Sequence, residues 1–275
     1  LSCSATPEQI RKIFKRRRTL IIGRRFRLVH LFHEREIIEI STFRRRPSNN
    51  GAAQLKGGKP RANTPEHMIF RDNEYGSAEE DALRRDFTVN AVFYDPVNDR
   101  VADFTGLGLS DIHAGIVRTI GEAQLRFEED PVRILRAIKL VGQYGFTMDD
   151  ETKAAVQTCL SLIDHVPNSR LTLEMEKILK SPYGDKILEA FHRYGFLKRF
   201  LPFLDEHWDT PQRAYAFEIW RMRNERVLAK EYRDSISLAM SLLVLPFAEE
   251  RFGKAGKGGL WDYFQDIDYA MSDFI

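Results

Sequence analysis

Residues Arg84, Arg85 and Asp86 are consecutive and combine two guanidinium groups with one carboxylate. Guanidinium groups bind phosphate oxygens through paired hydrogen bonds, so Arg84 and Arg85 are candidate contacts for a triphosphate or a ribose. The neighbouring carboxylate of Asp86 could accept a ribose hydroxyl or face a metal-bound triphosphate. The alternative is an ion pair on the surface, which contributes little to stability.

A second candidate pair, Asp130 and Arg133, lies where the sequence predicts the start of a helix. Asp130 is a predicted N-cap, and Pro131 suits the first helical position. A spacing of three residues places the two side chains side by side. Adenine offers an amino donor at N6 and an acceptor at N1, which match a carboxylate and a guanidinium. Cytosine has the same order, whereas guanine and uracil reverse it, so the pair could admit ATP or CTP. An ordinary capped helix with an ion pair is the alternative.

The basic residues are clustered, although the chain of 275 residues has a net charge of only +2. The clusters lie around Arg16, around Arg24 and Arg25, and around Arg45. Such clusters can neutralise the phosphates of RNA, and RNA binding should then depend strongly on salt. A solvated charged surface is the alternative.

Other features of the composition limit the class of protein. No apolar run reaches the length of about 18 residues that a membrane-spanning helix needs, so we expect no membrane association. The two cysteines, Cys3 and Cys159, do not make a disulfide framework, and a reducing cytoplasmic location is the simpler interpretation.

The elements that must position these residues change in type along the chain. Thr6, Pro7 and Gln9 predict a capped helix start, with the helix running to about residue 15. Strands are predicted at 19–22, 26–32, 37–43 and 89–94, the last paired with 100–103, and a short helix at 78–85. From residue 131 onward the apolar spacing is helical. The chain is therefore predicted to be α+β to about residue 120 and helical beyond it.

These motifs together resemble the class II nucleotidyltransferases, which comprise bacterial poly(A) polymerases and tRNA CCA-adding enzymes. Residues 84–90 match the family's RRDFTxN motif, and residues 129–133 match its EDxxR motif. Residues 103–118 resemble the intervening hinge segment, and Ser169, Arg170 and Glu174 resemble the neck motif. Residues 20–30, LIIGRRFRLVH, resemble the GRRFxLxH signature of the bacterial poly(A) polymerases. Two departures are an extra residue in the hinge, Gly106-Leu107-Gly108-Leu109, and Lys139-Leu140 in place of Arg-Phe.

The resemblance implies a fold and a division of the chain. We expect a polymerase β-like nucleotidyltransferase head with a mixed sheet at residues 1–120. Nucleotide-recognition neck helices should follow at 121–180, and a helical RNA-binding body at 181–275. The family's catalytic Asp-x-Asp strand should precede Leu1 and is missing from this sequence, so the chain as given is expected to be inactive alone.

The resemblance also implies an activity: template-independent addition of AMP from ATP to RNA 3′ ends, with two Mg²⁺ ions, in a monomeric protein that promotes RNA turnover. Asp86 is the implied catalytic carboxylate, and Glu39 is a candidate third metal ligand. Asp130 and Arg133 should read the base, with Arg136 supporting them. The alternatives are a CCA-adding enzyme and a non-catalytic RNA-binding fragment.

Overall fold

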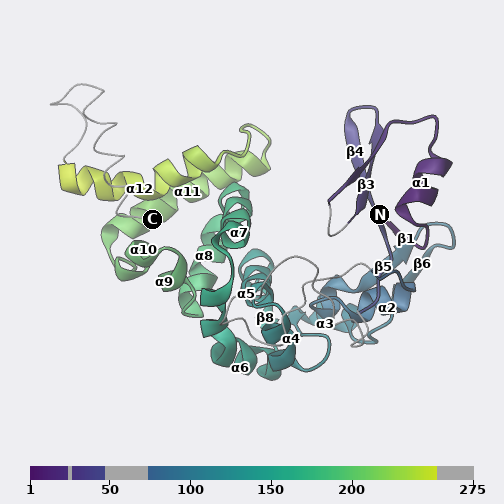
Figure 1. Cartoon of the computed structure of the whole chain (residues 1–275). Coiled ribbons are helices and arrows are strands. Elements are labelled where there is room, and N and C mark those ends of the chain that lie inside the picture. The colour runs from purple at the N-terminus through teal and green to yellow at the C-terminus, as the bar shows by residue number, and fades with distance from the viewer. Residues whose placement is uncertain (24–26, 47–73, 253–275) are drawn as a thin grey trace. The chain divides into compact units, whose positions relative to one another are not determined.

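The computed structural model describes residues 1–23, 27–46 and 74–252, and it divides into two compact units (Figure 1). Unit 1 comprises residues 1–130 and 149–155, and unit 2 comprises residues 131–148 and those from 156 onward. Arg24 and Arg25, two of the predicted RNA contacts, lie outside the described residues.

Unit 1 contains a mixed four-stranded sheet in the order β1-β4-β3-β2. Its strands are β1 (Ser2–Cys3), β2 (Thr19–Ile22), β3 (Leu28–His33) and β4 (Glu36–Thr42). β1 runs parallel to β4, and the other pairs are antiparallel. Successive side chains of a strand point to opposite faces of the sheet, so Val29, Leu31 and Ile40 are buried together on one face.

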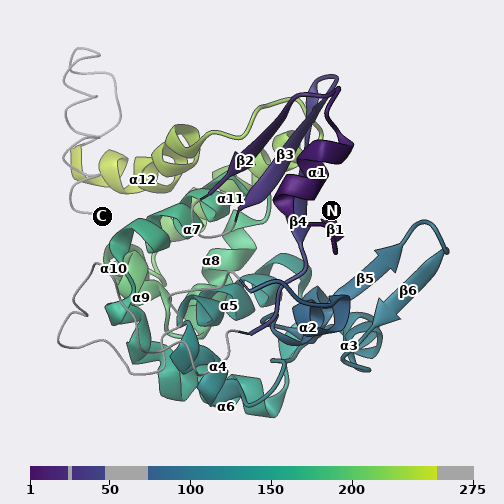
Figure 2. The ribbon, with the colours of Figure 1, turned by 45° about the vertical axis from the view of Figure 1, so that its right-hand side comes forward.

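Helix α1 (Pro7–Ile13) covers this face, where its Ile10 joins the same core (Figure 2). The predicted capping box is confirmed: the Thr6 hydroxyl accepts from the Gln9 amide, and the Gln9 side chain accepts from the Thr6 amide. The buried face of the sheet therefore depends on a helix whose start the sequence specifies.

The rest of unit 1 carries the candidate nucleotide-binding motifs on short elements. They are α2 (Ala78–Leu83), the 3₁₀ turn η2 (Thr88–Asn90), β5 (Val92–Asp95), β6 (Arg100–Asp103), α3 (Gly108–Ala114), β7 (Ile116–Val117) and α4 (Ala123–Glu129). β5 and β6 form the predicted antiparallel hairpin. The predicted strand 89–94 was wrong at its start, because residues 88–90 turn tightly there.

Up to residue 252, where the description of the structure ends, unit 2 is helical apart from the short strand β8 (Thr147–Met148). Its helices are α5 (Val132–Tyr144), η3 (Leu160–His165), α7 (Asn168–Lys180), α8 (Gly184–Arg193), α9 (Leu197–Phe200), α10 (Pro202–Glu206), α11 (Pro211–Leu228) and α12 (Ile236–Phe252). Helix α6 (Asp150–Cys159) begins in unit 1 and continues in unit 2. The predicted change from α+β to helical structure is confirmed.

Helices α5 and α8 approach each other closely at Gly142. A Cβ atom at this position would lie 2.5 Å from the Ile187 Cα, nearer than real side chains allow. In the first turn of α8, the buried carboxylate of Asp185 accepts hydrogen bonds from Asn224 at 2.9 Å and Arg221 at 3.2 Å, both on α11. Within the described residues, no helix is long and apolar enough to cross a membrane.

Candidate nucleotide-binding site

The predicted phosphate contacts Arg84 and Arg85 are both held by Asp81, a carboxylate of α2 that is 3% exposed. Asp81 Oδ1 accepts from Arg84 Nη2 at 2.8 Å, and Asp81 Oδ2 accepts from Arg85 Nη2 at 3.1 Å. Asp81 Oδ1 also accepts from the backbone amide of Arg44 at 3.0 Å, just beyond β4. The buried carboxylate is thus compensated by two guanidinium groups and one amide, which fixes the arginine pair against the end of the sheet.

Arg85 has further contacts beside Asp81. Its Nη1 donates to the carbonyl oxygen of Asn90 at 2.7 Å, and its guanidinium lies 4.6 Å from the centre of the Phe93 ring. Phe93 in turn packs edge-on against Phe43 and Phe104. Arg85 therefore joins α2 to the hairpin, in addition to any contact with phosphate.

Asp86 follows the arginine pair and is half-buried. Its Oδ1 accepts from the Phe87 amide at 3.0 Å and from Asn90 Nδ2 at 3.1 Å. Its carbonyl oxygen accepts from the Ile120 amide at 3.1 Å, and the Phe87 side chain is fully buried. The backbone that carries Asp86 is consequently anchored immediately after it.

Thr88 anchors the same segment to α3. Its hydroxyl donates to the buried Asp111 at 2.7 Å, and Arg118 Nε donates to the same carboxylate at 3.0 Å. The hydrogen bond from Arg118 to Asp111 raises the pKa of the Arg118 guanidinium above its ordinary value. At the start of α3, a Cβ on Gly108 would lie 2.8 Å from the Thr88 carbonyl oxygen, so only glycine permits this close approach.

Asp103 organises the hinge turn that contains the extra residue. Its carboxylate accepts from the Thr105 hydroxyl at 2.7 Å and from the amides of Thr105, Gly106 and Leu109. Burial acts to raise the pKa of Asp103, but these hydrogen bonds outweigh it and lower the pKa below its ordinary value. Gly106 adopts a left-handed φ of 69°, which lets the lengthened turn close without strain.

In unit 2, α5 carries Arg133, Arg136 and Lys139 at three-residue intervals. Glu174 of α7 is buried, accepts from Lys177 Nζ at 2.7 Å, and acts electrostatically on Lys139. Burial lowers the pKa of the Lys139 ammonium below its ordinary value, and Glu174 partly offsets this effect. Three cations along one helix suit an anionic ligand.

Asp130 lies between α4 and α5 and is half-buried. The predicted N-cap role was wrong by one residue: Asp130 ends α4, with its amide donating to the Arg126 carbonyl oxygen, and Pro131 occupies the N-cap position of α5. Asp130 belongs to unit 1, whereas Arg133 and Arg136 belong to unit 2. Their combination in one base-reading site stays a prediction.

Two family models match the chain: "Poly A polymerase head domain" over residues 1–118, and "Probable RNA and SrmB- binding site of polymerase A" over residues 145–207. Poly(A) polymerase I of Escherichia coli is 31% identical over 279 residues, a match that covers 100% of this chain. Poly(A) polymerase I of Haemophilus influenzae is 36% identical over 78% of this chain and 46% of its own length. The CCA-adding enzyme of Geobacillus thermodenitrificans is 33% identical over 79% of this chain and 49% of its own length. The chain belongs to the poly(A) polymerase and CCA-adding enzyme family.

Solved structures confirm the nucleotidyltransferase fold of this family member. A tRNA-processing enzyme in an apo form has a TM-score of 0.63 at 21% identity, covering 97% of this chain and 64% of that one. A Bacillus stearothermophilus CCA-adding enzyme in complex with CTP has a TM-score of 0.57 at 23% identity, covering 98% of this chain and 72% of that one. The chain spans 58% of the length of the Escherichia coli relative.

The described residues do not fit the two-metal site that the family resemblance implies. None of their His, Cys, Asp and Glu side chains form a group of three that could hold a metal ion. Glu39, the predicted metal ligand, lies opposite His30 in the sheet, with 3.0 Å between Glu39 Oε1 and His30 Nε2, and its side chain is 64% exposed.

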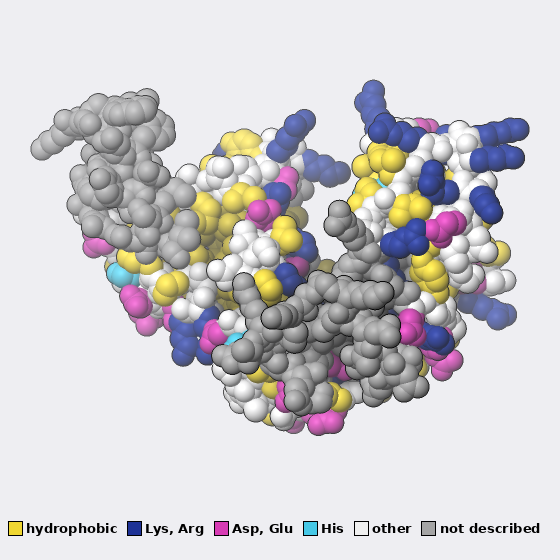
Figure 3. Space-filling model, viewed as in Figure 1, with side chains coloured by type: hydrophobic (Ala, Val, Ile, Leu, Met, Phe, Trp, Pro, Cys, Tyr) yellow, Lys and Arg dark blue, Asp and Glu magenta, His cyan; other side chains and the backbone are white. Residues whose placement is uncertain are grey.

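Lys and Arg side chains gather on the part of unit 1 that carries α1 and the sheet (Figure 3). Arg16, a predicted RNA contact, is exposed in a run of exposed basic residues that comprises Lys15, Arg16, Arg17 and Arg18. Arg45, a second predicted RNA contact, has a side chain that is 54% exposed, and its Nε donates to Glu74 Oε2 at 3.1 Å. Their contact with RNA stays a prediction.

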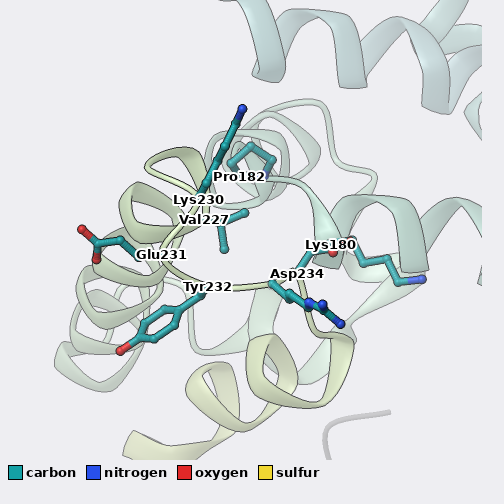
Figure 4. Close-up of a pocket in the computed structure, with 8 residues that line it drawn as sticks. Lys180, Pro182, Val227, Lys230, Glu231, Tyr232 and Asp234 are labelled. Atoms are coloured by element: carbon teal, nitrogen blue, oxygen red, sulfur yellow. The ribbon is translucent and has the colours of Figure 1, made fainter. Parts of the chain in front are cut away.

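Unit 2 has an open pocket of about 570 Å³ between the end of α7 and the turn from α11 to α12 (Figure 4). Its lining includes Lys180, Lys230 and Arg233 together with Tyr232. The Tyr232 hydroxyl accepts from Arg226 Nη1 at 2.7 Å, which holds the ring in place. The lining also includes Glu231 and Asp234, so the pocket combines cations and an aromatic ring with two carboxylates. Sequence reasoning missed it, because its residues come from three separate elements.

Proposed function

We propose that this protein is an RNA 3′-adenylyltransferase that adds AMP from ATP without a template, and so promotes RNA turnover. The observation that carries the proposal is the anchored Arg84-Arg85-Asp86 segment, in which one buried carboxylate, that of Asp81, holds two guanidinium groups next to the half-buried Asp86. Relatives named poly(A) polymerase I support it, since the Escherichia coli protein aligns with 100% of this chain. The GRRFRLVH segment at 23–30 supports the same branch of the family.

In the proposed reaction, the oxygen of the RNA 3′ hydroxyl forms a bond to the α-phosphorus of ATP. The bond from that phosphorus to the bridging oxygen of the β-phosphate breaks, pyrophosphate leaves with the electron pair, and the hydroxyl proton is released. We assign Arg84 and Arg85 to the triphosphate or ribose, and Asp86 to the reacting centre. Because Asp81 holds both guanidinium groups, they are in position before the nucleotide binds. Little side-chain conformational entropy is then lost on binding.

We assign the base-reading role to Asp130 and Arg133, with Arg136 supporting them. A carboxylate that accepts from the adenine amino group and a guanidinium that donates to N1 would together favour ATP over GTP. Lys139 follows Arg136 by three residues on α5 and is a third basic residue on that helix. This helix would attract an anionic nucleotide.

RNA binding is proposed for the basic surface around Arg16 and for the pocket lined by Lys180 and Lys230. Both supply positive charge that phosphates can contact, and Tyr232 offers an aromatic edge beside the pocket. A monomer working in the cytoplasm is proposed as well, a reducing compartment in which the thiols of Cys3 and Cys159 would stay reduced. A requirement for Mg²⁺ stays a prediction.

The experiment that tests the proposal incubates the protein in its natural full length with ATP alone and an unstructured RNA. We expect long A tails on gel electrophoresis. Addition of a single A to a tRNA ending in CC, with no tail on the unstructured RNA, would instead favour a CCA-adding enzyme, which the 33% identity to the Geobacillus thermodenitrificans protein keeps as the second candidate. Binding of RNA without incorporation of AMP in either reaction would identify a non-catalytic RNA-binding protein.

A further inference from the structure

Arg126 is a buried arginine of α4 with 1% of its surface exposed. Burial of a guanidinium is unfavourable unless hydrogen bonds compensate it. Its Nη2 donates to the carbonyl oxygen of Arg84 at 2.6 Å and also to that of Arg85, and its Nη1 donates to Glu129 at 2.6 Å. The guanidinium therefore binds the backbone of the arginine pair, whereas Asp81 binds their side chains.

The two carbonyl groups lie just beyond the end of α2, where helix carbonyls no longer have their usual partners. A cation at this end of a helix is favourable both for these carbonyls and for the helix dipole. The carbonyl of Arg85 belongs to the peptide bond that leads into Asp86. Arg126 therefore fixes the orientation of the peptide plane before Asp86.

The peptide plane after Asp86 is fixed separately, because the Ile120 amide donates to the Asp86 carbonyl oxygen at 3.1 Å. With both planes fixed, the direction in which the Asp86 side chain leaves the backbone is determined. Arg126 is also four residues before Asp130, whose amide donates to the Arg126 carbonyl oxygen. One residue thus contacts both the segment that carries Asp86 and the end of the helix that carries Asp130.

We propose that Arg126 is a positioning residue that sets Asp86 and Asp130 relative to each other for adenylyl transfer. This inference rests on the proposed function for its catalytic consequence, but its structural part does not. It assigns Arg126 no contact with the nucleotide. Replacing it should therefore lower the rate of the chemical step and relax base choice, with little change in the affinity for ATP.

The test compares Arg126→Lys with Arg223→Lys in the full-length protein. Lysine keeps the charge but lacks the planar fork that reaches two carbonyls and Glu129 together. Arg223 is a matched control, since it is 4% exposed and donates to Asn224 at 2.9 Å in unit 2. For R126K we expect kcat to fall on the order of 10- to 100-fold, with KM for ATP nearly unchanged and a lower ATP-to-GTP preference. R223K should lower thermal stability but leave these three values as in the wild type.

Amide hydrogen exchange supplies a measurement that does not depend on activity. Exchange at the Ile120 amide should become faster in R126K than in R223K, because its acceptor is no longer held. If R126K does not fold, Glu129→Gln tests the same inference with a smaller effect in the same direction, because Arg126 loses its charged partner. Equal exchange at Ile120 and equal kcat in the variant and the wild type would overturn the inference. A wild-type protein that incorporates no AMP would instead refute the proposed function, while the exchange measurement would still decide the structural role.

Discussion

Asp81 in unit 1 and Asp185 in unit 2 are both carboxylates with 3% exposure, and both bind arginine side chains. Asp185 joins α8 to α11 through Asn224 and Arg221, so it holds two long helices together. Asp81 holds arginines three and four residues along the same short chain segment. A buried carboxylate that binds arginine side chains is therefore not, by itself, evidence of a functional site. The evidence comes from the chain segment to which those arginines belong.

The strongest test of this comparison replaces each carboxylate by its amide. Asp81→Asn should lower the free energy of unfolding by about 3 kcal/mol, because two partly buried arginines lose their charged partner, whereas Asp185→Asn should lower it less, because Arg221 is 53% exposed. Only Asp81→Asn should also reduce AMP incorporation by folded protein, on the order of 100-fold, since the arginine pair is then misplaced. Urea unfolding and initial rates measure the two effects. Equal loss of activity in both variants would show that Asp81 acts through stability alone.

A second variant, at Asp130, distinguishes recognition of the base from binding of the rest of the nucleotide. Asp130→Ala should lower the preference for ATP over GTP by about 1–3 kcal/mol, the discrimination typical of a hydrogen-bonded base edge. Binding of RNA should change much less. Misincorporation rates measure the preference, with Glu128→Ala as the neighbouring control. Unchanged preference would remove the assigned role of Asp130.

The arginines themselves sharpen the comparison further. Arg85→Lys should slow AMP incorporation on the order of 10-fold, because lysine cannot span Asp81 and the Asn90 carbonyl together. Arg221→Lys, at a side chain that is 53% exposed, should change stability by less than about 0.5 kcal/mol and leave the rate unaltered. A similar rate for both variants would argue against a specific role for the fork of Arg85.

Removal of surface charge compares the two units as RNA-binding surfaces. Arg16→Ala with Arg17→Ala should weaken RNA binding and flatten the plot of log affinity against log salt by about 0.7 for each phosphate that is no longer neutralised. Lys230→Ala should change this slope less, by the amount expected when one phosphate is no longer neutralised. Fluorescence titrations at several salt concentrations measure both slopes. Slopes identical to that of the wild type would exclude these side chains as phosphate ligands.

The smallest expected effect concerns Asp103 in the hinge turn. Its pKa is lower in the folded protein than in an unfolded chain, so its ionised form stabilises the fold above the unfolded pKa. This stabilisation is lost as the pH falls through the folded pKa. The Tm of Asp103→Asn should therefore lie below that of the wild type at neutral pH, and the difference should narrow in acid. A difference that stays constant with pH would contradict the assignment.

Local chemistry in the sequence was enough to predict much of unit 1. The capping box at Thr6 and the hairpin after Asn90 depend on residues close together in the chain, and both are confirmed. The buried positions of Asp81 and Arg126 could not be predicted in this way, because in the sequence a buried charged residue of a short helix looks the same as a solvent-exposed one. Their burial arises from contacts with residues up to 42 positions away, such as that between Arg126 and Arg84. An acid three and four residues before the arginine pair was the available hint for Asp81.

The close approach at Gly142 has a consequence for how the protein can move. Since α5 meets the α8 backbone with no room for even one carbon atom, the two helices cannot slide or turn past each other without first separating. Arg133 and Arg136 lie on α5, so any motion of the α5 backbone that carries these arginines also carries α8. Flexibility of the backbone must therefore arise at other points of the chain, and the helix bearing both arginines moves together with α8 as one rigid piece.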